Sequence, residues 1–231
     1  MIKVILWDID GTILDFEASE KNAIRNCFEQ FELGECTDEM LRRYSVINRS
    51  YWKRLERGEL TKPEVLEGRF EEFFGNEGIR TDIVPSFNKE YQLRLADTIC
   101  YNDSADEILD YYKGQIKQYA VTNGTKVAQE RKLAKSGLDK VFDGIFISDE
   151  IGAEKPAHEF FEKVWKTIGI YDCSEILIIG DSLTSDMQGG HNEGIVCCWY
   201  NPKKMEGNPM LNIAHEISDL NQIKEIIDAY K

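Results

Sequence analysis

The chain opens on a short apolar segment that stops at acidic residues. Residues 2–7 are apolar except for Lys3, and they are rich in β-branched and aromatic side chains. Such a run is typical of a strand that is buried on both faces, as in a parallel sheet. Asp8 and Asp10 follow directly at its end. Because ligands of open α/β sheets bind outside the carboxyl ends of strands, this position predicts a site.

After Asp15 the apolar period changes from that of a strand to that of helices and stays so to about residue 96. One predicted helix begins after Thr37 and ends at Gly58, and the next opens at Thr61 with a capping box and an early proline. Four helical segments with no strand between them predict a separate helical domain. The third of these helices is expected to turn inward Leu66, Phe70, Phe73 and Phe74.

From Ser104 onward strands and helices alternate, beginning with a capping box at Ser104. This alternation predicts an α/β fold: a doubly wound parallel sheet, Rossmann-like, with an inserted all-helical domain. We assign residues 1–15 and 97–231 to the sheet domain and residues 16–96 to the helical one. The later strands are expected at residues 119–122, 144–148, 176–179 and 195–200.

All strands of a parallel sheet end at the same edge, so Asp8, Thr122 and Asp181 are expected to meet there. If the substrate were a phosphate monoester, Asp8 could attack phosphorus and form an aspartyl-phosphate, while Asp10 could act as general acid and then as general base. Taken alone, Asp10 with the glycine after it is also an ordinary turn signal. The other motifs favour the chemical interpretation.

A second set of residues suits a phosphate group. The hydroxyl of Thr122 and the amides of Asn123 and Gly124 are expected at the start of a helix, which is a natural anion position. Lys155 precedes Pro156, which we expect in the first turn of a helix, so the lysine would be held in place.

Metal binding is predicted from the carboxylates. Asp181 and Asp186 suit Mg²⁺, a hard cation that prefers oxygen ligands. Ionised Asp8, Asp181 and Asp186 with a phosphate dianion carry about −5 against +1 from Lys155, so the site needs a cation.

Composition limits the partners. The 231 residues are 42% hydrophobic and 30% charged, with a formal net charge of −14. Such an acidic chain is not expected to bind a nucleic-acid polymer or an anionic membrane. The six cysteines show no metal-binding spacing, so we expect reduced core thiols in a cytoplasmic protein. No apolar run is long enough to span a membrane, and no cleavage signal follows the N-terminal run, so we expect the mature chain to be the whole sequence.

Four motifs can now be set in order: Asp8 with Asp10, Thr122 to Gly124, Lys155 with Pro156, and Asp181 with Asp186. They resemble the four motifs of the haloacid dehalogenase (HAD) superfamily, and the resemblance covers essentially the whole chain. The resemblance implies that Asp8 is the nucleophile and Asp10 the acid/base. It also implies that Mg²⁺ is bound by the carboxylates of Asp8 and Asp181 and by the backbone carbonyl of Asp10. Asp186 would hold Lys155 and the waters bound to the metal in place, without binding the metal directly.

The helical domain resembles the cap of noncanonical pyrimidine 5'-nucleotidases, which implies that Asn48, Trp52 and Arg69 contact the substrate. Asn48 and Trp52 are four residues apart and share a helix face. One could bond to a base edge while the other stacks on it. The alternative is that Trp52 and Phe70 are core residues and Arg69 forms a surface ion pair.

The sequence therefore predicts an Mg²⁺-dependent phosphatase of small phosphate monoesters, with a pyrimidine nucleoside 5'-monophosphate as the expected substrate. One alternative is a sugar-phosphate phosphatase or phosphomutase, similar to phosphoglycolate phosphatase or β-phosphoglucomutase, and another is a non-catalytic binding module. The oligomeric state, monomer or dimer, stays open. The helical domain is expected to close over the site by hinging near Phe16 and Asp97.

Overall fold

The computed structural model describes residues 1–169 and 172–231. Its backbone divides into two compact units. The sheet unit comprises residues 1–16 and 99–231, and the helical unit comprises residues 17–98.

The sheet unit is built on six parallel strands in the order β3-β2-β1-β4-β5-β6. The first strand therefore lies inside the sheet, between β2 and β4, and every residue of β1 is buried. The strands are β1 (Val4–Trp7), β2 (Lys117–Thr122), β3 (Gly144–Ile147), β4 (Ile176–Gly180), β5 (Val196–Tyr200) and β6 (His215–Ile217).

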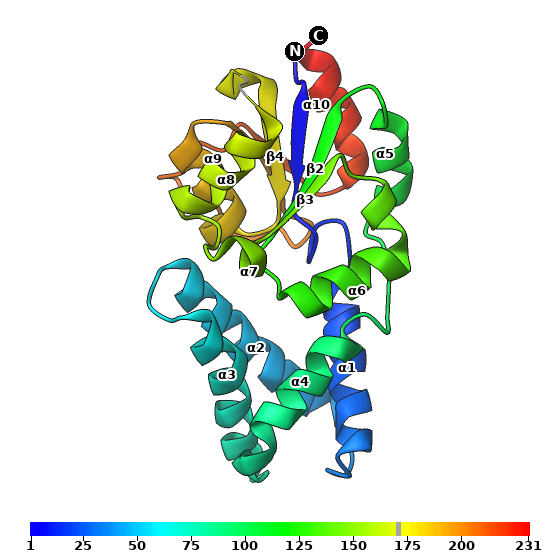
Figure 1. Cartoon of the computed structure of the whole chain (residues 1–231), viewed down its shortest axis with the longest axis vertical. Coiled ribbons are helices and arrows are strands. Elements are labelled where there is room, and N and C mark those ends of the chain that lie inside the picture. Colours follow the sequence, from blue (N-terminus) through cyan, green and yellow to red (C-terminus); the bar gives the residue numbers. More distant parts are fainter. Residues whose placement is uncertain (170–171) are drawn as a thin grey trace. The chain divides into compact units, whose positions relative to one another are not determined.

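Helices cover both faces of this sheet (Figure 1). Successive side chains of a strand point to opposite faces, so Ile5 and Trp7 pack into one apolar cluster while Val4 and Leu6 pack into the other. The predicted doubly wound parallel fold is confirmed. One face is covered by α5 (Ala105–Tyr112), α6 (Lys126–Ser136) and α10 (Ile223–Ala229), and the other by α8 (His158–Ile168) and α9 (Gln188–Glu193).

The helical unit has an aromatic core. The ring of Phe70 lies at the centre of this core. Its centroid is 5.1 Å from the ring centroids of Tyr44, Phe87 and Tyr91. Phe70 is thus a core residue, as one of the two interpretations held. The capping box of Thr61 is present, since its backbone N–H donates to the Glu64 carboxylate at 2.7 Å. The four helices are α1 (Phe16–Gln30), α2 (Asp38–Glu56), α3 (Lys62–Glu77) and α4 (Val84–Arg94).

Some local predictions are wrong. Ser104 has a left-handed backbone with φ 57° and its side chain makes no cap bond, so the expected capping box is not formed. On α3, Phe70, Phe73 and Phe74 are buried as predicted, but Leu66 is only half-buried and its neighbour Val65 is buried instead. The sequence pattern also gave no sign of β6 or of the short helix α7 (Ser148–Ile151).

The cysteines are all free thiols. Burial raises the pKa of Cys27, Cys197 and Cys198 to about 12, as expected of core thiols. Cys100 and Cys173 are exposed, so the expectation of six core thiols is wrong for these two. Among residues 1–169 and 172–231, no helix combines the length and the apolar character that crossing a membrane requires.

Candidate active site

Three neighbouring strands end at the same place in the sheet unit. Because β1 pairs with both β2 and β4, Trp7 lies opposite Ala120 on one side and Ile179 on the other. Asp8 therefore leaves β1 next to the carboxyl ends of β2 and β4. Thr122 is the last residue of β2, and Asp181 is the first residue after β4. The sheet brings these three residues together although they are far apart in sequence.

Three carboxylates form a cluster at this edge. Oxygen atoms of Asp8, Asp181 and Asp186 all lie within 4.8 Å of one another. Asp186 comes from the single helical turn Leu183–Met187 that follows β4, and it is almost fully buried. Oxygen donors at this spacing suit a hard divalent cation such as Mg²⁺. Asp186 itself offers an oxygen to this cluster, whereas the expected contact of Asp186 with the metal was through water.

Gly11 makes room for this cluster. A Cβ at this position would lie only 2.8 Å from the Oδ2 atom of Asp181, and the backbone φ of +92° also disfavours other residues. A glycine is therefore needed here for Asp181 to approach the loop that carries Asp8 and Asp10. The hydroxyl of Thr12 in the same loop donates to Asp8 Oδ2 at 3.1 Å and orients the carboxylate.

Lys155 bridges two of the three carboxylates, those of Asp8 and Asp186. Its Nζ donates to Asp8 Oδ1 at 2.8 Å, to Asp186 Oδ1 at 2.6 Å and to the backbone carbonyl of Val121 at 2.7 Å. An ammonium group has three hydrogens, so each of them has an acceptor. To contact a phosphoryl oxygen, Lys155 has to exchange one of these bonds.

Burial and charge shift the acidities of this pair. Burial raises the pKa of Asp8 to about 7, the charge of Asp186 adds to the rise, and Lys155 opposes it. Burial alone would lower the pKa of Lys155, but the carboxylates of Asp186 and Asp8 outweigh it and hold that pKa above its ordinary value. Lys155 thus stays protonated and favours the ionised form of Asp8.

The position of Lys155 depends on Asn123. The Asn123 side chain donates from Nδ2 to the Lys155 carbonyl at 2.8 Å, and its Oδ1 accepts from the Lys155 backbone N–H at 2.8 Å. These two bonds fix the lysine backbone. The expected helix start is wrong here: Pro156 follows a cis peptide bond and precedes Ala157, the N-cap of α8, so it is outside the first helical turn.

The loop after β2 is held by internal bonds. The Gly124 N–H donates to Thr122 Oγ1 at 3.1 Å, and Thr122 is almost fully buried. Residues 122–124 were expected at the start of a helix, but α6 begins only at Lys126, with Thr125 as its N-cap. Residues 122–124 therefore lie in the loop before the helix. Thr122, Asn123 and Gly124 nevertheless all lie in the loop beside Lys155.

Asp10 has partners that the sequence analysis did not identify. Its Oδ1 accepts from Lys132 Nζ at 2.6 Å and its Oδ2 accepts from Gln129 Nε2 at 2.6 Å. Its carboxylate is not a member of the three-carboxylate cluster. The only signal in the sequence was that Gln129 and Lys132, three residues apart on α6, fall on the face that also carries Ala128 and Leu133.

In the helical unit, Asn48 and Arg69 belong to a buried polar network. Asn48 donates to Glu20 Oε1 at 2.7 Å and accepts from Arg69 Nη1 at 2.7 Å. Arg69 is 1% exposed and its Cζ lies 6.0 Å from the ring centroid of Trp52. The alternative of a surface ion pair for Arg69 is therefore wrong. Trp52 is the half-buried member of the predicted trio.

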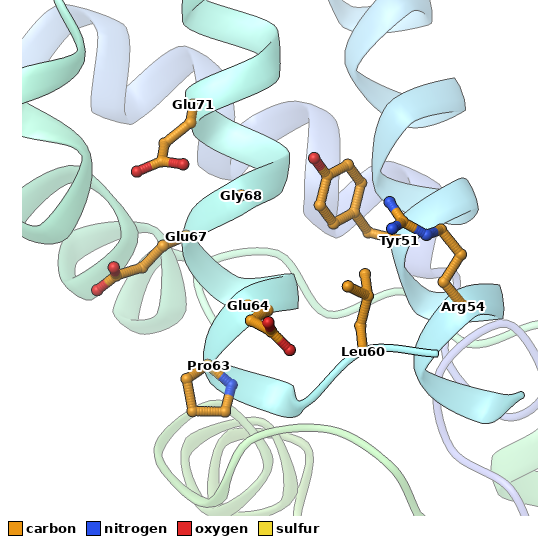
Figure 2. Close-up of a pocket in the computed structure, with 8 residues that line it drawn as sticks. All are labelled: Tyr51, Arg54, Leu60, Pro63, Glu64, Glu67, Gly68 and Glu71. Atoms are coloured by element: carbon orange, nitrogen blue, oxygen red, sulfur yellow. The ribbon is translucent and has the colours of Figure 1, made fainter. Parts of the chain in front are cut away.

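A surface pocket of about 400 Å³ lies between α2 and α3 of the helical unit (Figure 2). Three glutamates of α3 line one side of it, and Tyr51 and Arg54 of α2 line the other. Asn48, Trp52 and Arg69 are not among its lining residues. Because its charge is mainly negative, this pocket does not suit an anionic phosphate monoester.

Comparison with known proteins gives matches along nearly the whole chain. Residues 2–194 match the family model of the haloacid dehalogenase-like hydrolases. The chain is 34% identical to the HAD-hydrolase YfnB of Bacillus subtilis, covering 98% of this chain and 95% of YfnB. A crystal structure of YfnB bound to magnesium has a TM-score of 0.92 at 33% identity, covering 98% of this chain and 99% of that one.

Two further relatives carry more specific names. The pyrimidine 5'-nucleotidase PynA of Streptococcus pneumoniae is 34% identical, over 98% of this chain and 95% of its own length. The pyrimidine 5'-nucleotidase YjjG of Escherichia coli is 26% identical, over 96% of each chain.

The fold, the site and these matches define an α/β hydrolase whose site lies at the carboxyl edge of a parallel sheet. The chain belongs to the haloacid dehalogenase-like hydrolases.

Proposed function

We propose that the protein is an Mg²⁺-dependent phosphomonoesterase that works through an aspartyl-phosphate on Asp8. The observation that carries this proposal is the ammonium group of Lys155, which bridges Asp8 and Asp186 beside the three-carboxylate cluster. A buried nucleophilic carboxylate held next to a fixed cation is what attack on a phosphate ester requires.

The contacts support the following roles. Asp8 attacks phosphorus, and Asp10 protonates the leaving oxygen and later activates water. Lys155 and the loop of Thr122, Asn123 and Gly124 bind the phosphoryl oxygens, with Lys155 exchanging one of its three present acceptors.

Mg²⁺ would be held by Asp8 and Asp181, by the Asp10 carbonyl, and by Asp186 directly or through water. When bound, it would neutralise negative charge on the phosphate and on the carboxylates. The donor set supports this part of the proposal because all of its atoms are oxygens.

For the substrate we propose a pyrimidine nucleoside 5'-monophosphate. Two relatives that span nearly the full chain bear the name pyrimidine 5'-nucleotidase. In the helical unit, Trp52 is the accessible member of the predicted trio, and it could stack on a base. Asn48 and Arg69 would then act by holding the helix face that carries Trp52, because their polar atoms bond mainly to other residues of that unit.

A substrate panel tests this assignment. Initial rates are measured with uridine, thymidine and purine nucleoside 5'-monophosphates, and with sugar phosphates. The pyrimidine nucleotides are expected to give the highest kcat/KM, and Trp52→Ala is expected to lower it at least about fivefold, since base–aromatic stacking contributes about 1–3 kcal/mol. A preference for sugar phosphates would contradict the nucleotide assignment and would leave the phosphatase assignment standing.

A further inference from the structure

Two buried polar side chains of α6 converge on the carboxylate of Asp10. Lys132 Nζ lies 2.6 Å from Asp10 Oδ1, and Gln129 Nε2 lies 2.6 Å from Asp10 Oδ2. Both side chains are only 1% exposed, whereas the Asp10 side chain is 21% exposed. One carboxylate is therefore held at both of its oxygens from the buried side and stays open on the other.

Stability of the fold does not account for this arrangement. An ion pair with a buried member contributes little compared with apolar side chains of the same volume, because the Lys132 ammonium loses its hydration. The Oε1 atom of Gln129 is buried and has no hydrogen-bond partner within residues 1–169 and 172–231, which is a further cost. The amide thus satisfies Asp10 and leaves its own acceptor unpaired.

The surroundings keep the two side chains in place. A Cβ at position 124 would lie 2.2 Å from Gln129 Nε2, so the glycine of the loop after β2 leaves the space that the amide fills. The Lys132 ammonium also lies 5.0 Å from the centroid of the Phe16 ring, which is a cation–π contact. Both donors are consequently fixed by their packing as well as by Asp10.

We propose that Lys132 and Gln129 are positioning residues that set the direction of the Asp10 carboxylate toward the leaving oxygen of the substrate. This inference rests on the proposed function, in which Asp10 is the general acid. Neither side chain needs to touch the substrate. Each holds one oxygen of Asp10, so the carboxyl group is fixed in direction before the reaction. When Asp10 carries a proton, that proton passes to the ester oxygen as the P–O bond breaks, and Lys132 and Gln129 stabilise the carboxylate that is left.

The dependence of the rate on the leaving group separates this role from a merely structural one. p-Nitrophenolate is a stable leaving group that needs little protonation, whereas the alcohol of a nucleoside 5'-monophosphate needs a general acid. The ratio kcat/KM reports the steps up to transfer of the phosphoryl group to the enzyme. Loss of the positioning residues should therefore lower kcat/KM for the alkyl ester selectively.

The experiment compares Lys132→Met and Gln129→Leu with Lys135→Met, a matched control at an exposed position on the same helix. General acid catalysis contributes about 10²–10⁴-fold, so we expect Lys132→Met to lower kcat/KM for the best alkyl phosphate at least tenfold more than for p-nitrophenyl phosphate. Gln129→Leu should show the same selectivity to a smaller extent. Lys135→Met should leave kcat/KM unchanged for both the alkyl phosphate and p-nitrophenyl phosphate.

Lys132→Arg keeps a cation at this position and should recover part of the alkyl-ester activity, which also serves the test if Lys132→Met does not fold. Equal losses on both esters, or no loss in the folded Lys132 and Gln129 variants, would overturn the inference. Failure of the wild-type protein to hydrolyse either ester would instead reject the proposed function, and the inference with it.

Discussion

At the scale of single residues, Lys155 is the group on which the site depends most. It is 1% exposed and gives all three of its hydrogens to Asp8, Asp186 and Val121. The same three bonds explain its location between two carboxylates that would otherwise repel each other. Its chemical role and its contribution to stability are therefore expected to be lost together.

Replacing Lys155 with Met should affect both properties. Removal of one member of a buried ion pair leaves the partner charges uncompensated and costs about 3–5 kcal/mol. Loss of an electrostatic contact to the reacting group costs about 10²–10³-fold in kcat. Chemical unfolding and phosphatase rates measure the two effects. The control is Lys163→Met, an exposed lysine on α8; equal stability and activity in both variants would contradict the assigned role.

At the scale of elements, a buried polar network joins three helices of the helical unit. Glu20 on α1 accepts hydrogen bonds from Ser45 and Asn48 on α2, and Asn48 in turn accepts from Arg69 on α3. Burial raises the pKa of Glu20 above its ordinary value of 4.5, although the bonds from Ser45 and Asn48 oppose the rise. The folded chain thus holds the Glu20 proton more tightly than the unfolded chain does.

The raised pKa of Glu20 determines how its contribution to the free energy of unfolding changes with pH. A raised pKa in the folded state means that the contribution of Glu20 is fully present below pH 4.5 and is lost as the pH rises through the folded-state value. The difference in unfolding free energy between the wild type and Glu20→Gln should accordingly fall as the pH rises above 4.5. Urea unfolding at several pH values measures it. A difference that rises with pH would show that Glu20 is stabilised in its ionised form.

The elements also show how far the sequence could predict this structure. Strand patterns and the residues that follow them located Asp8, Thr122 and Asp181, because a parallel sheet fixes where strand ends meet. Lys132 and Gln129 could not be found in this way, since their role depends on the packing of α6 against the loop that carries Asp10. Periodicity treats a buried lysine as a break in the apolar stripe.

Errors of local prediction have a similar origin. The order of residues around Ser104 fits a capping box, but the backbone of Asp103 and Ser104 is left-handed, and the Asp103 carboxylate accepts bonds from Tyr200 and from the Leu220 N–H. Those partners lie about a hundred residues away in sequence, with sequence separations of 97 and 117. A long-range contact of this kind overrides a local signal and cannot be read from it.

At the scale of the whole molecule, we propose that the predicted helical domain at residues 16–96 acts as a cap that excludes water from the site during the reaction. The proposed hinges lie near Phe16 and Asp97, close to the boundaries between the two compact units. Crystal structures with and without a bound phosphate analogue such as vanadate measure the motion. We expect the helical unit to rotate about these hinges; an identical placement in both structures would contradict closure.

Because the whole chain is acidic, the central claim is that the site needs a bound metal ion to accept an anionic substrate. With a net charge of −14 and a cluster of three carboxylates, an anionic substrate meets repulsion unless a cation is present. The most direct measurement is the turnover of p-nitrophenyl phosphate by the wild type and by Asp8→Asn, each with Mg²⁺ and after treatment with EDTA. The account predicts full turnover only in the wild type with Mg²⁺. The rate of Asp8→Asn should be lower by about 10³-fold or more. Equal rates in Asp8→Asn, or wild-type turnover that survives removal of the metal, would contradict it.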